Sequence, residues 1–311
     1  MTGIILAVLF VILFLMILRV VYSIAFGVKS VHENVDLNIP RYAQYEELRS
    51  NIEREVKSLL SELCEKVSIH SRDGLKLTGR YYQMDPKAPV VILFHGYRGS
   101  AVKDSVGGFN VSKSMGYNIL IVDERSHGDS EGRTITMGIK ERYDCLDWIH
   151  YVTERFGQEK KIMIMGLSMG AATVLMASEL DLPENVKGIV ADCGYSNVKE
   201  MVIRVAGFMH FPAKIIYPFA RLSARIYGGF DPDETSPASA LRNCKIPVLL
   251  IHGEADELVP VEMSWENYHA CGSEKEILIV PKANHGLSYY VDQKTYIEKT
   301  GAFMKKCLED E

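Results

Sequence analysis

Short, nearly continuous apolar runs alternate with helical patterns through most of the chain, and this alternation restricts the fold more than any other feature. A strand that is apolar on both faces has to be covered on both faces, as happens where crossover helices pack on either side of a parallel sheet. The sequence therefore predicts an α/β fold with a mostly parallel central sheet and helices on both faces. The predicted strands are 90–94, 118–123, 161–165, 188–192, 247–251 and 276–280, and the predicted helices between them lie near 104–115, 137–155, 169–179, 261–271 and 293–308.

A different pattern precedes the first of these strands. Residues 65–83 alternate between apolar and polar side chains on either side of Arg72-Asp73-Gly74. Alternation around an Asp-Gly turn is typical of a β-hairpin. We therefore expect the sheet to begin with an antiparallel edge.

The N-terminus is continuously apolar. Residues 3–28 contain a single charge, Arg19, and a helix of this length crosses a hydrocarbon core of about 30 Å. We interpret residues 1–28 as an N-terminal transmembrane helix that anchors the protein to a membrane. A cleaved signal peptide is the alternative: Ser23-Ile24-Ala25 would suit the protease, but Met1-Thr2 supplies no basic n-region.

Positive charge follows the apolar segment and does not precede it, at Lys29, Arg41 and Arg49. This bias favours a cytoplasmic position for the rest of the chain. Residues 29–66 are predicted to form a linker or stalk whose helical part begins after Pro40, and we assign no chemistry to it. Its helix is expected either to pack on the following domain or to stand off the membrane.

The catalytic domain is expected to cover residues 67–311, with one interruption. More than fifty residues separate the strands that end at 192 and begin at 247, which is long for a crossover connection. Within this stretch, 198–227 has a helical pattern rich in Met, aromatic and Arg residues. We predict a cap insertion over residues 198–243, above the active site; additional core packing is the alternative.

Gly166-Leu167-Ser168-Met169-Gly170 has the form G-x-S-x-G, and its position gives it weight. It follows a predicted strand and begins a helix rich in small residues, which is the setting of a nucleophile elbow. The sharp turn strains the backbone of the serine and leaves no room for side chains beside it. The pattern predicts that Ser168 is a nucleophile.

A serine hydroxyl needs a base to become nucleophilic, and the base needs an acid that orients it. Where a nucleophile elbow is present, the acid and then the histidine follow the serine along the chain. Asp256 and His285 both follow predicted strands, so both lie at the sheet edge where Ser168 lies. We predict that His285 is the base and Asp256 the acid; His252 is the rival base, and Glu254 and Glu257 are the rival acids.

Two backbone N–H groups are expected to stabilise the oxyanion. The N–H of Met169 lies at the start of the helix after the nucleophile, where the helix dipole assists it. The second donor should come from the loop after the first parallel strand, which reads His95-Gly96-Tyr97-Arg98-Gly99. Gly96 lets this backbone approach the site, and the N–H of Tyr97 is the expected donor.

From about Val67 to its end the chain resembles the α/β-hydrolase superfamily, and within it the bacterial, often membrane-anchored branch of acyl-aminopeptidase-like and bile-acid-CoA acyltransferase-like hydrolases. One position departs from the usual D-x-R-G-H-G-x-S: Ser126 stands where glycine is common, and we expect no effect of this on the three catalytic residues. The motifs that carry the resemblance are those at 95–99 and 166–170 together with Asp123-Glu124-Arg125-Ser126-His127-Gly128-Asp129-Ser130-Glu131-Gly132, Gly253-Glu254-Ala255-Asp256-Glu257-Leu258-Val259-Pro260 and Asn284-His285-Gly286.

The resemblance implies acyl transfer without a metal or an organic cofactor. The substrate would be a small acyl ester, hydrolysed by a carboxylesterase or lipase-like enzyme. A peptidase or amidase that uses the same three residues is one alternative, and a membrane-tethered binding protein that has lost activity is another. The net charge of −5 is not that of a nucleic-acid-binding protein, and the six cysteines lack zinc-ligand spacing.

Overall fold

A computed structural model describes residues 1–28, 39–40, 43–208 and 212–309. Its centre is an 8-stranded sheet with the order β1-β2-β4-β3-β5-β6-β7-β8. β2 pairs antiparallel with β1 and with β4, and all other neighbours are parallel. This is the α/β-hydrolase fold, and it confirms the predicted parallel sheet with an antiparallel hairpin at its edge. The strands are β1 Glu65–His70, β2 Lys76–Tyr82, β3 Val90–Phe94, β4 Asn118–Asp123, β5 Ile162–Leu167, β6 Val186–Asp192, β7 Val248–Gly253 and β8 Lys275–Val280.

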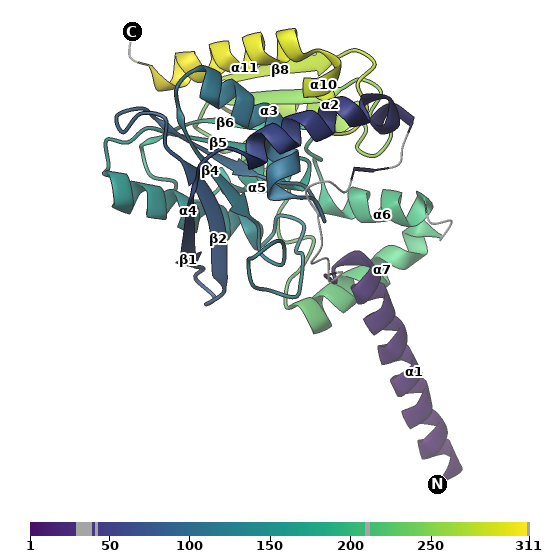
Figure 1. The fold of residues 1–311 in the computed structure, drawn as a ribbon. Helices are drawn as coiled ribbons and strands as arrows, with labels where there is room; N and C mark the ends of the chain where they lie inside the picture. Colours follow the sequence, from purple (N-terminus) through teal and green to yellow (C-terminus); the bar gives the residue numbers. More distant parts are fainter. Residues whose placement is uncertain (29–38, 41–42, 209–211, 310–311) are drawn as a thin grey trace.

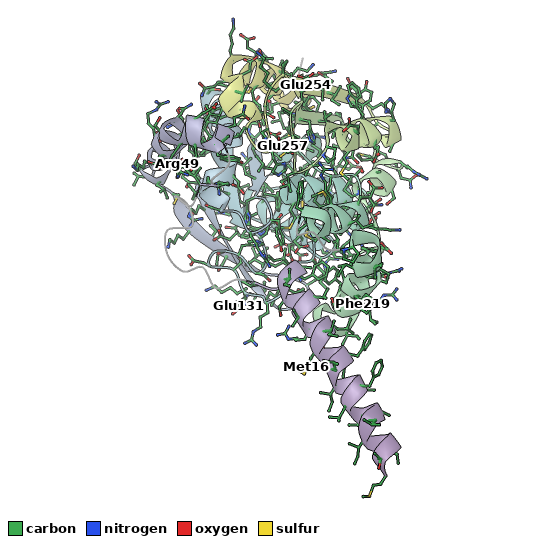
Figure 2. The ribbon with its side chains drawn as sticks, turned by 90° about the vertical axis from the view of Figure 1, so that its right-hand side faces the viewer. Met16, Arg49, Glu131, Phe219, Glu254 and Glu257 are labelled. Atoms are coloured by element: carbon green, nitrogen blue, oxygen red, sulfur yellow. The ribbon has the colours of Figure 1, made fainter. Side chains whose placement is uncertain are left out.

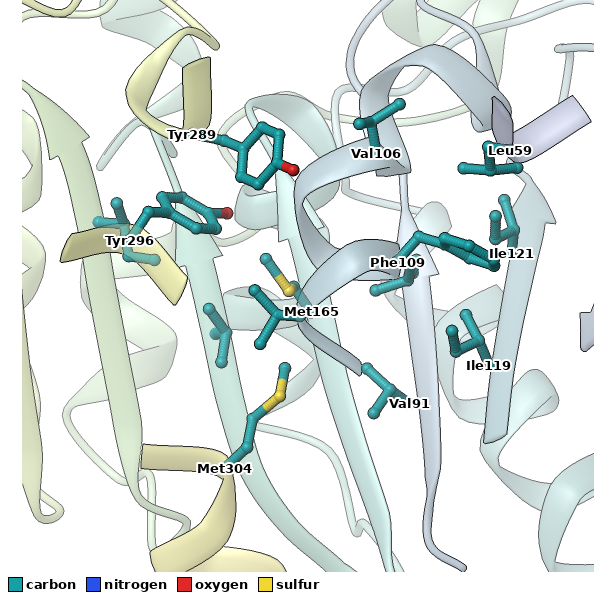
Figure 3. Close-up of a cluster of buried hydrophobic side chains, with 14 of the residues drawn as sticks. Leu59, Val91, Val106, Phe109, Ile119, Ile121, Met165, Tyr289, Tyr296 and Met304 are labelled. Carbon is teal, nitrogen blue, oxygen red and sulfur yellow. The ribbon is translucent and has the colours of Figure 1, made fainter. Parts of the chain in front are cut away.

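Helices cover both faces of the sheet, as the apolar strands require. Along β3, Val91 and Leu93 join one buried cluster, whereas Val90 and Ile92 join the other. Figure 3 shows part of the first cluster, where Phe109 and Met304 reach the strands from helices on that face. The helices are α1 Thr2–Ala25, α2 Ala43–Leu60, α3 Ala101–Ser114, α4 Glu141–Phe156, α5 Met169–Ala177, α6 Val198–Phe208, α7 Ala213–Ser223, η2 Ala224–Gly228, α8 Pro237–Leu241, α9 Val261–Ala270, α10 Ser288–Val291 and α11 Gln293–Leu308.

The N-terminal helix α1 projects from the body of the molecule, away from the end where the C-terminus lies (Figure 1). Most of its side chains are exposed, but its last turns are part of the domain. Leu18, Tyr22 and Phe26 are buried, and the Ile135 N–H donates to the carbonyl of Phe26 at 2.9 Å. The expected linker falls largely on residues 29–38 and 41–42, which lie outside the described part of the chain.

Helix α2 is the part of the expected stalk that the structure describes. Ile52, Val56 and Leu59 are buried in the cluster that also contains α3 and α11. Of the two arrangements considered for this helix, the structure therefore shows packing on the domain.

Two of the predicted helices differ from the structure more than the others do. The helix expected at 137–155 begins at Glu141, because Met137 and Gly138 have φ angles of 56° and 85°, which an α-helix cannot contain. The single helical pattern at 198–227 is divided into α6, α7 and the short π-helical η2. This cap segment follows β6 and lies beside α1 (Figure 1).

Candidate active site

Ser168 occupies a sharp turn between β5 and α5. Its φ of 57° and ψ of −110° are strained for a residue with a side chain. A Cβ atom at Gly166 would lie 2.2 Å from the backbone of Gly170, and one at Gly170 would lie 2.3 Å from the carbonyl oxygen of Phe94. Both flanking glycines are therefore required by the tightness of the turn.

A continuous chain of hydrogen bonds leads from this serine to a buried carboxylate. The Oγ of Ser168 lies 2.9 Å from Nε2 of His285. Nδ1 of the same imidazole lies 2.7 Å from Oδ2 of Asp256. The structure thus brings together the three side chains expected to act as nucleophile, base and acid, from loops that follow β5, β8 and β7.

Asp256 is held as a carboxylate. Its Oδ1 accepts the backbone N–H groups of Leu258 at 2.9 Å and Val259 at 2.8 Å. Burial acts to raise the pKa of Asp256, but the charge of His285 and hydrogen bonds from His252 and His285 outweigh it and lower the pKa to about 2. The acid is therefore ionised at every pH at which the protein would be assayed.

His252, the rival base, lies on the other side of Asp256. Its Nε2 is 3.2 Å from Oδ2 of Asp256 and 2.9 Å from the carbonyl oxygen of Val259, while its Nδ1 is 2.6 Å from Oγ of Ser264. These contacts bury His252 completely, so it orients the carboxylate and does not face the nucleophile. The rival acids Glu254 and Glu257 are exposed (Figure 2).

The residues that carry the two expected oxyanion donors lie in the segments next to Ser168. Met169 begins α5 and its side chain is fully buried. A Cβ atom at Gly96 would lie 3.5 Å from Cβ of Ser168, so the loop that carries the Tyr97 N–H passes directly beside the serine. The Gly96 N–H donates to Oδ2 of Asp104 at 3.0 Å, which orients the loop.

Two neutral histidines accept backbone hydrogen bonds at this loop and at the neighbouring loop after β4. The Arg98 N–H donates to Nε2 of His127 at 3.0 Å, and the Glu124 N–H donates to Nε2 of His95 at 3.0 Å. Burial lowers the pKa of both imidazoles, to about 4 for His127, where the neighbouring His95 adds to the shift. Each ring therefore has an unprotonated Nε2 that can accept a hydrogen bond at neutral pH.

His127 should consequently lower stability in mild acid. Between pH 6.5 and about 4 the unfolded chain binds a proton that folded His127 does not, so this residue reduces the free energy of unfolding as the pH falls, by up to about 3 kcal/mol. Burial raises the pKa of Asp144 to about 7 and that of Asp192 to about 6, so these two carboxyls change the free energy of unfolding in the opposite sense over this range. Urea unfolding at several pH values between 7.5 and 4.5 measures this slope. The slope should be smaller in His127→Gln than in the wild type, whereas replacing the exposed His269 should leave it unchanged.

The end of α1 is bonded to the same loop. The Arg98 guanidinium donates to the carbonyl oxygens of Ile24 at 3.0 Å and Gly27 at 2.8 Å, and the Tyr97 hydroxyl donates to the carbonyl oxygen of Ala25 at 2.9 Å. A cation at a helix C-terminus satisfies its free carbonyl groups and is favoured by the helix dipole. The N-terminal helix therefore holds the loop from which an oxyanion donor is expected.

Helix α2 holds the loop that contains His285. The Tyr45 hydroxyl donates to the carbonyl oxygen of His285 at 2.8 Å. The Gln44 side chain donates to the carbonyl oxygen of Lys282 and accepts the N–H of Asn284 at 2.7 Å. These contacts could not be predicted from the sequence, because nothing in the pattern of α2 indicates that two side chains of its first turn reach a loop about 240 residues away.

The loop after β4, which departs from the usual motif, is structural. Arg125 is buried and pairs with Asp144 at 2.6 Å and with Asp73 at 2.9 Å. Ser126 has a φ of 68°, a value that suits glycine. Its hydroxyl donates to the carbonyl oxygen of Thr134 and accepts the N–H of Thr134 at 3.1 Å, which offsets the strain.

One set of possible metal ligands lies at the site. Donor atoms of Cys193, Asp256 and His285 all lie within 4.8 Å of one another. Asp256 and His285 are already hydrogen-bonded to each other, so a metal ion here would replace the bond that orients the imidazole. The geometry fits proton transfer better than metal binding.

Known proteins are similar to this chain in sequence and in structure. The Bacillus subtilis uncharacterized protein YqkD is 26% identical over 237 residues, which are 76% of this chain and 77% of that protein. The lysophosphatidylserine lipase ABHD12 of Danio rerio is 26% identical over 202 residues, 61% of this chain but only 49% of that lipase. An esterase of Pyrococcus furiosus superposes with a TM-score of 0.63 at 25% identity, covering 81% of this chain and 95% of that structure.

The sequence profile of the prolyl oligopeptidase family matches residues 107–311, which contain the nucleophile elbow and the loops of Asp256 and His285. The superfamily resemblance seen in the sequence is thereby confirmed. The chain is an α/β-hydrolase and belongs to the prolyl oligopeptidase family.

Proposed function

We propose that the protein is a serine hydrolase that cleaves ester-type acyl bonds, with Ser168 as nucleophile, His285 as base and Asp256 as acid. The observation that carries the proposal is the continuous line of hydrogen bonds from Oγ of Ser168 through the imidazole to the Asp256 carboxylate. This line has the order and the distances that acyl transfer through a serine requires.

In the proposed reaction, Oγ of Ser168 attacks the acyl carbonyl carbon while Nε2 of His285 takes the hydroxyl proton. The N–H groups of Tyr97 and Met169 bind the oxyanion that develops. The intermediate collapses, the bond to the leaving alcohol breaks, and His285 returns the proton to that alcohol. A water molecule then attacks the acyl-enzyme with His285 again as base, which releases the carboxylic acid and restores Ser168.

Apolar surroundings and similarity favour an esterase or lipase-like substrate. Met169 and Tyr97 belong to an apolar cluster that also includes Tyr22, Phe26 and Met201, and a lipase and an esterase are among the similar proteins. A peptidase or amidase is the second candidate, because the family profile is named after a peptidase. Both candidates use the same three residues, so the leaving group distinguishes them.

A fluorophosphonate probe and a substrate panel test the proposal. The probe should label the full-length protein at Ser168, as located by peptide mass spectrometry. Esters of p-nitrophenol with short and long acyl chains should be hydrolysed faster than the matching thioesters, anilides and acyl-peptides. Faster cleavage of anilides or peptides would favour the peptidase, and absence of labelling would favour a binding protein without activity.

We further propose that α1 is a membrane anchor, with residues 29–66 as linker, 67–311 as catalytic domain and a cytoplasmic position for that domain. Thr2–Ala25 is long and apolar enough to cross a membrane, and most of its side chains are exposed. Cleavage after Ala25 would remove Leu18 and Tyr22 from the folded domain, which supports an uncleaved segment. Protease accessibility in sealed vesicles of both orientations tests the side.

Arg98→Ala should lower kcat about tenfold with little change in KM, because the loop that carries the Tyr97 N–H would lose its bonds to α1 and move away from the oxyanion. Arg98→Lys should recover part of the loss. Steady-state kinetics on a short, soluble ester measure both effects. Arg54→Ala, which removes a largely exposed guanidinium elsewhere, is the matched control. A tenfold rise in KM at constant kcat would instead place Arg98 in substrate binding.

A further inference from the structure

We propose that the cap segment, defined as α6, α7 and η2, is embedded in the surface layer of the bilayer that α1 crosses, and that the enzyme takes amphiphilic acyl esters directly from that bilayer. This inference rests on the proposed esterase activity and anchor, and it adds the lipid surface as the binding partner of the cap and the bilayer as the source of substrate.

The cap contacts α1 within the apolar part of the helix, several residues before its C-terminal end. The rings of Phe14 and Phe219 lie 6.1 Å apart, and the Tyr227 hydroxyl donates to the carbonyl oxygen of Leu15 at 2.9 Å. Figure 2 shows Phe219 beside α1 near Met16, and these contacts lie about one turn before Leu18, where the helix becomes buried in the domain.

A membrane-spanning helix needs about 20 residues, so a span that begins at Thr2 ends near residue 21. Phe14 and Leu15 then lie about 10 Å inside that boundary, at a rise of about 1.5 Å per residue. The cap residues that contact them must lie at the same depth. Helices that lie in a membrane surface are typically immersed by about 5–10 Å.

The side chains of the cap suit this position. Ile215, Phe219, Leu222 and Ile226 recur at spacings of four, three and four residues, which places them on one face of α7 and η2. Ile215 is 63% exposed, Leu222 38% and Ile226 49%. Outside residues 1–25, the large apolar side chains that are exposed in the described part of the chain are Val205, Phe208, Ile215, Leu222 and Ile226 in the cap, and Val28, Leu60, Leu63 and Trp265 elsewhere.

Three arginines near this apolar face contact aromatic rings or a carboxylate. Arg19, the single charge of α1, lies over the rings of Tyr22 at 5.0 Å and Tyr227 at 5.6 Å. Arg221 pairs with Asp231 at 2.8 Å, and Arg225 pairs with the same carboxylate. Cation–π contacts and ion pairs reduce the cost of placing these groups at the boundary between headgroups and acyl chains.

The embedded segment is also joined to the active site. The Arg204 side chain on α6 donates to the carbonyl oxygens of Glu257 at 2.7 Å and Leu258 at 2.9 Å, in the loop of Asp256. The apolar cluster around Met169 includes side chains of both α1 and the cap, such as Tyr22 and Met201. Apolar side chains of the proposed membrane-facing elements therefore pack next to the residue that follows Ser168.

A kinetic comparison tests the source of substrate. The double variant Leu222→Gln/Ile226→Gln of the full-length protein, reconstituted in phosphatidylcholine vesicles, should hydrolyse a long-chain 4-methylumbelliferyl ester held in those vesicles about tenfold more slowly than the wild type. Its rate on water-soluble p-nitrophenyl acetate should be unchanged. The matched control is Leu60→Gln/Leu63→Gln, which replaces two exposed leucines outside the cap and should change neither rate.

A depth measurement tests the embedding independently of activity. In a Cys64→Ser background, Ile226→Cys carries an environment-sensitive fluorophore, and phospholipids brominated on their acyl chains should quench it. The same label at Leu63→Cys should not be quenched.

These outcomes separate the claims. Absence of quenching at position 226 in protein that floats with the vesicles would overturn the embedding, and unchanged hydrolysis of the vesicle-borne ester by the cap variant would overturn the bilayer as substrate source. Wild-type protein inactive on both esters would overturn the proposed esterase, and failure to float would overturn the anchor.

Discussion

Ser168→Ala should lower ester hydrolysis by at least about a thousandfold, because the acyl-enzyme cannot form without the hydroxyl. The residual rate should come from the oxyanion donors and from substrate binding alone. The fold should be retained, because alanine fits the turn and the substitution removes only the hydroxyl that bonds to His285.

The measurement is kcat/KM on p-nitrophenyl esters for purified full-length protein, with circular dichroism as the check on folding. Ser114→Ala is the matched control: Ser114 is exposed at the end of α3, where its hydroxyl donates only to the carbonyl oxygen of Val111. It should stay within about twofold of the wild type. A folded Ser168→Ala protein that hydrolyses esters at the wild-type rate would remove Ser168 from the mechanism.

Asp256→Asn should lower kcat by about ten-thousandfold, the size of effect known for the equivalent change in another serine hydrolase. The backbone N–H groups of Leu258 and Val259 fix one side-chain oxygen as acceptor. The amide NH₂ would then face Nδ1 of His285, which forces the imidazole into the tautomer whose Nε2 carries the proton. That nitrogen could no longer accept the proton of Ser168.

The exposed rival acids provide controls for this prediction. Glu254→Gln and Glu257→Gln should each change kcat by less than about twofold, because neither side chain is buried at the site. A large loss in either of these variants, with Asp256→Asn active, would reassign the acid.

The pH dependence of Asp256 follows from its folded-state pKa of about 2, lowered from 3.8. A carboxyl whose pKa is lowered on folding stabilises the protein fully above its unfolded pKa. Its contribution is lost as the pH falls from 3.8 through 2. Asp256 therefore contributes no loss of stability between pH 6.5 and 4, the range in which the loss from His127 is expected.

The fold and the three central residues of the site could be predicted because their signals are local. The strands of the parallel sheet are apolar runs of five to seven residues in the structure, and the predicted and observed bounds agree within two residues for β3 to β8. Ser168 lies in a pentapeptide between a strand and a helix. Asp256 and His285 follow strands whose carboxyl ends meet at one edge, so chain order and topology were sufficient to bring them together.

The predicted helix bounds differ most from the structure where a single residue delays or ends a helix that the spacing of apolar residues would continue. Positive φ angles at Met137 and Gly138 delay the start of α4. Helix α7 begins after Pro212, which cannot continue a helix that precedes it, so the pattern at 198–227 is divided. The spacing of apolar residues shows neither effect, because it records which side chains are apolar and not the backbone conformation at a single residue.

The sequence by itself determined the α/β-hydrolase fold, the apolar N-terminal helix and the three residues of the proposed mechanism. Only the tertiary structure decided that α1 ends on the loop of Tyr97, that α2 holds the loop of His285 and that His252 supports Asp256. The physical reason is separation along the chain. Arg98 meets Gly27 across 71 residues and Tyr45 meets His285 across 240, and such bonds form only after packing of the whole domain has brought the two segments together.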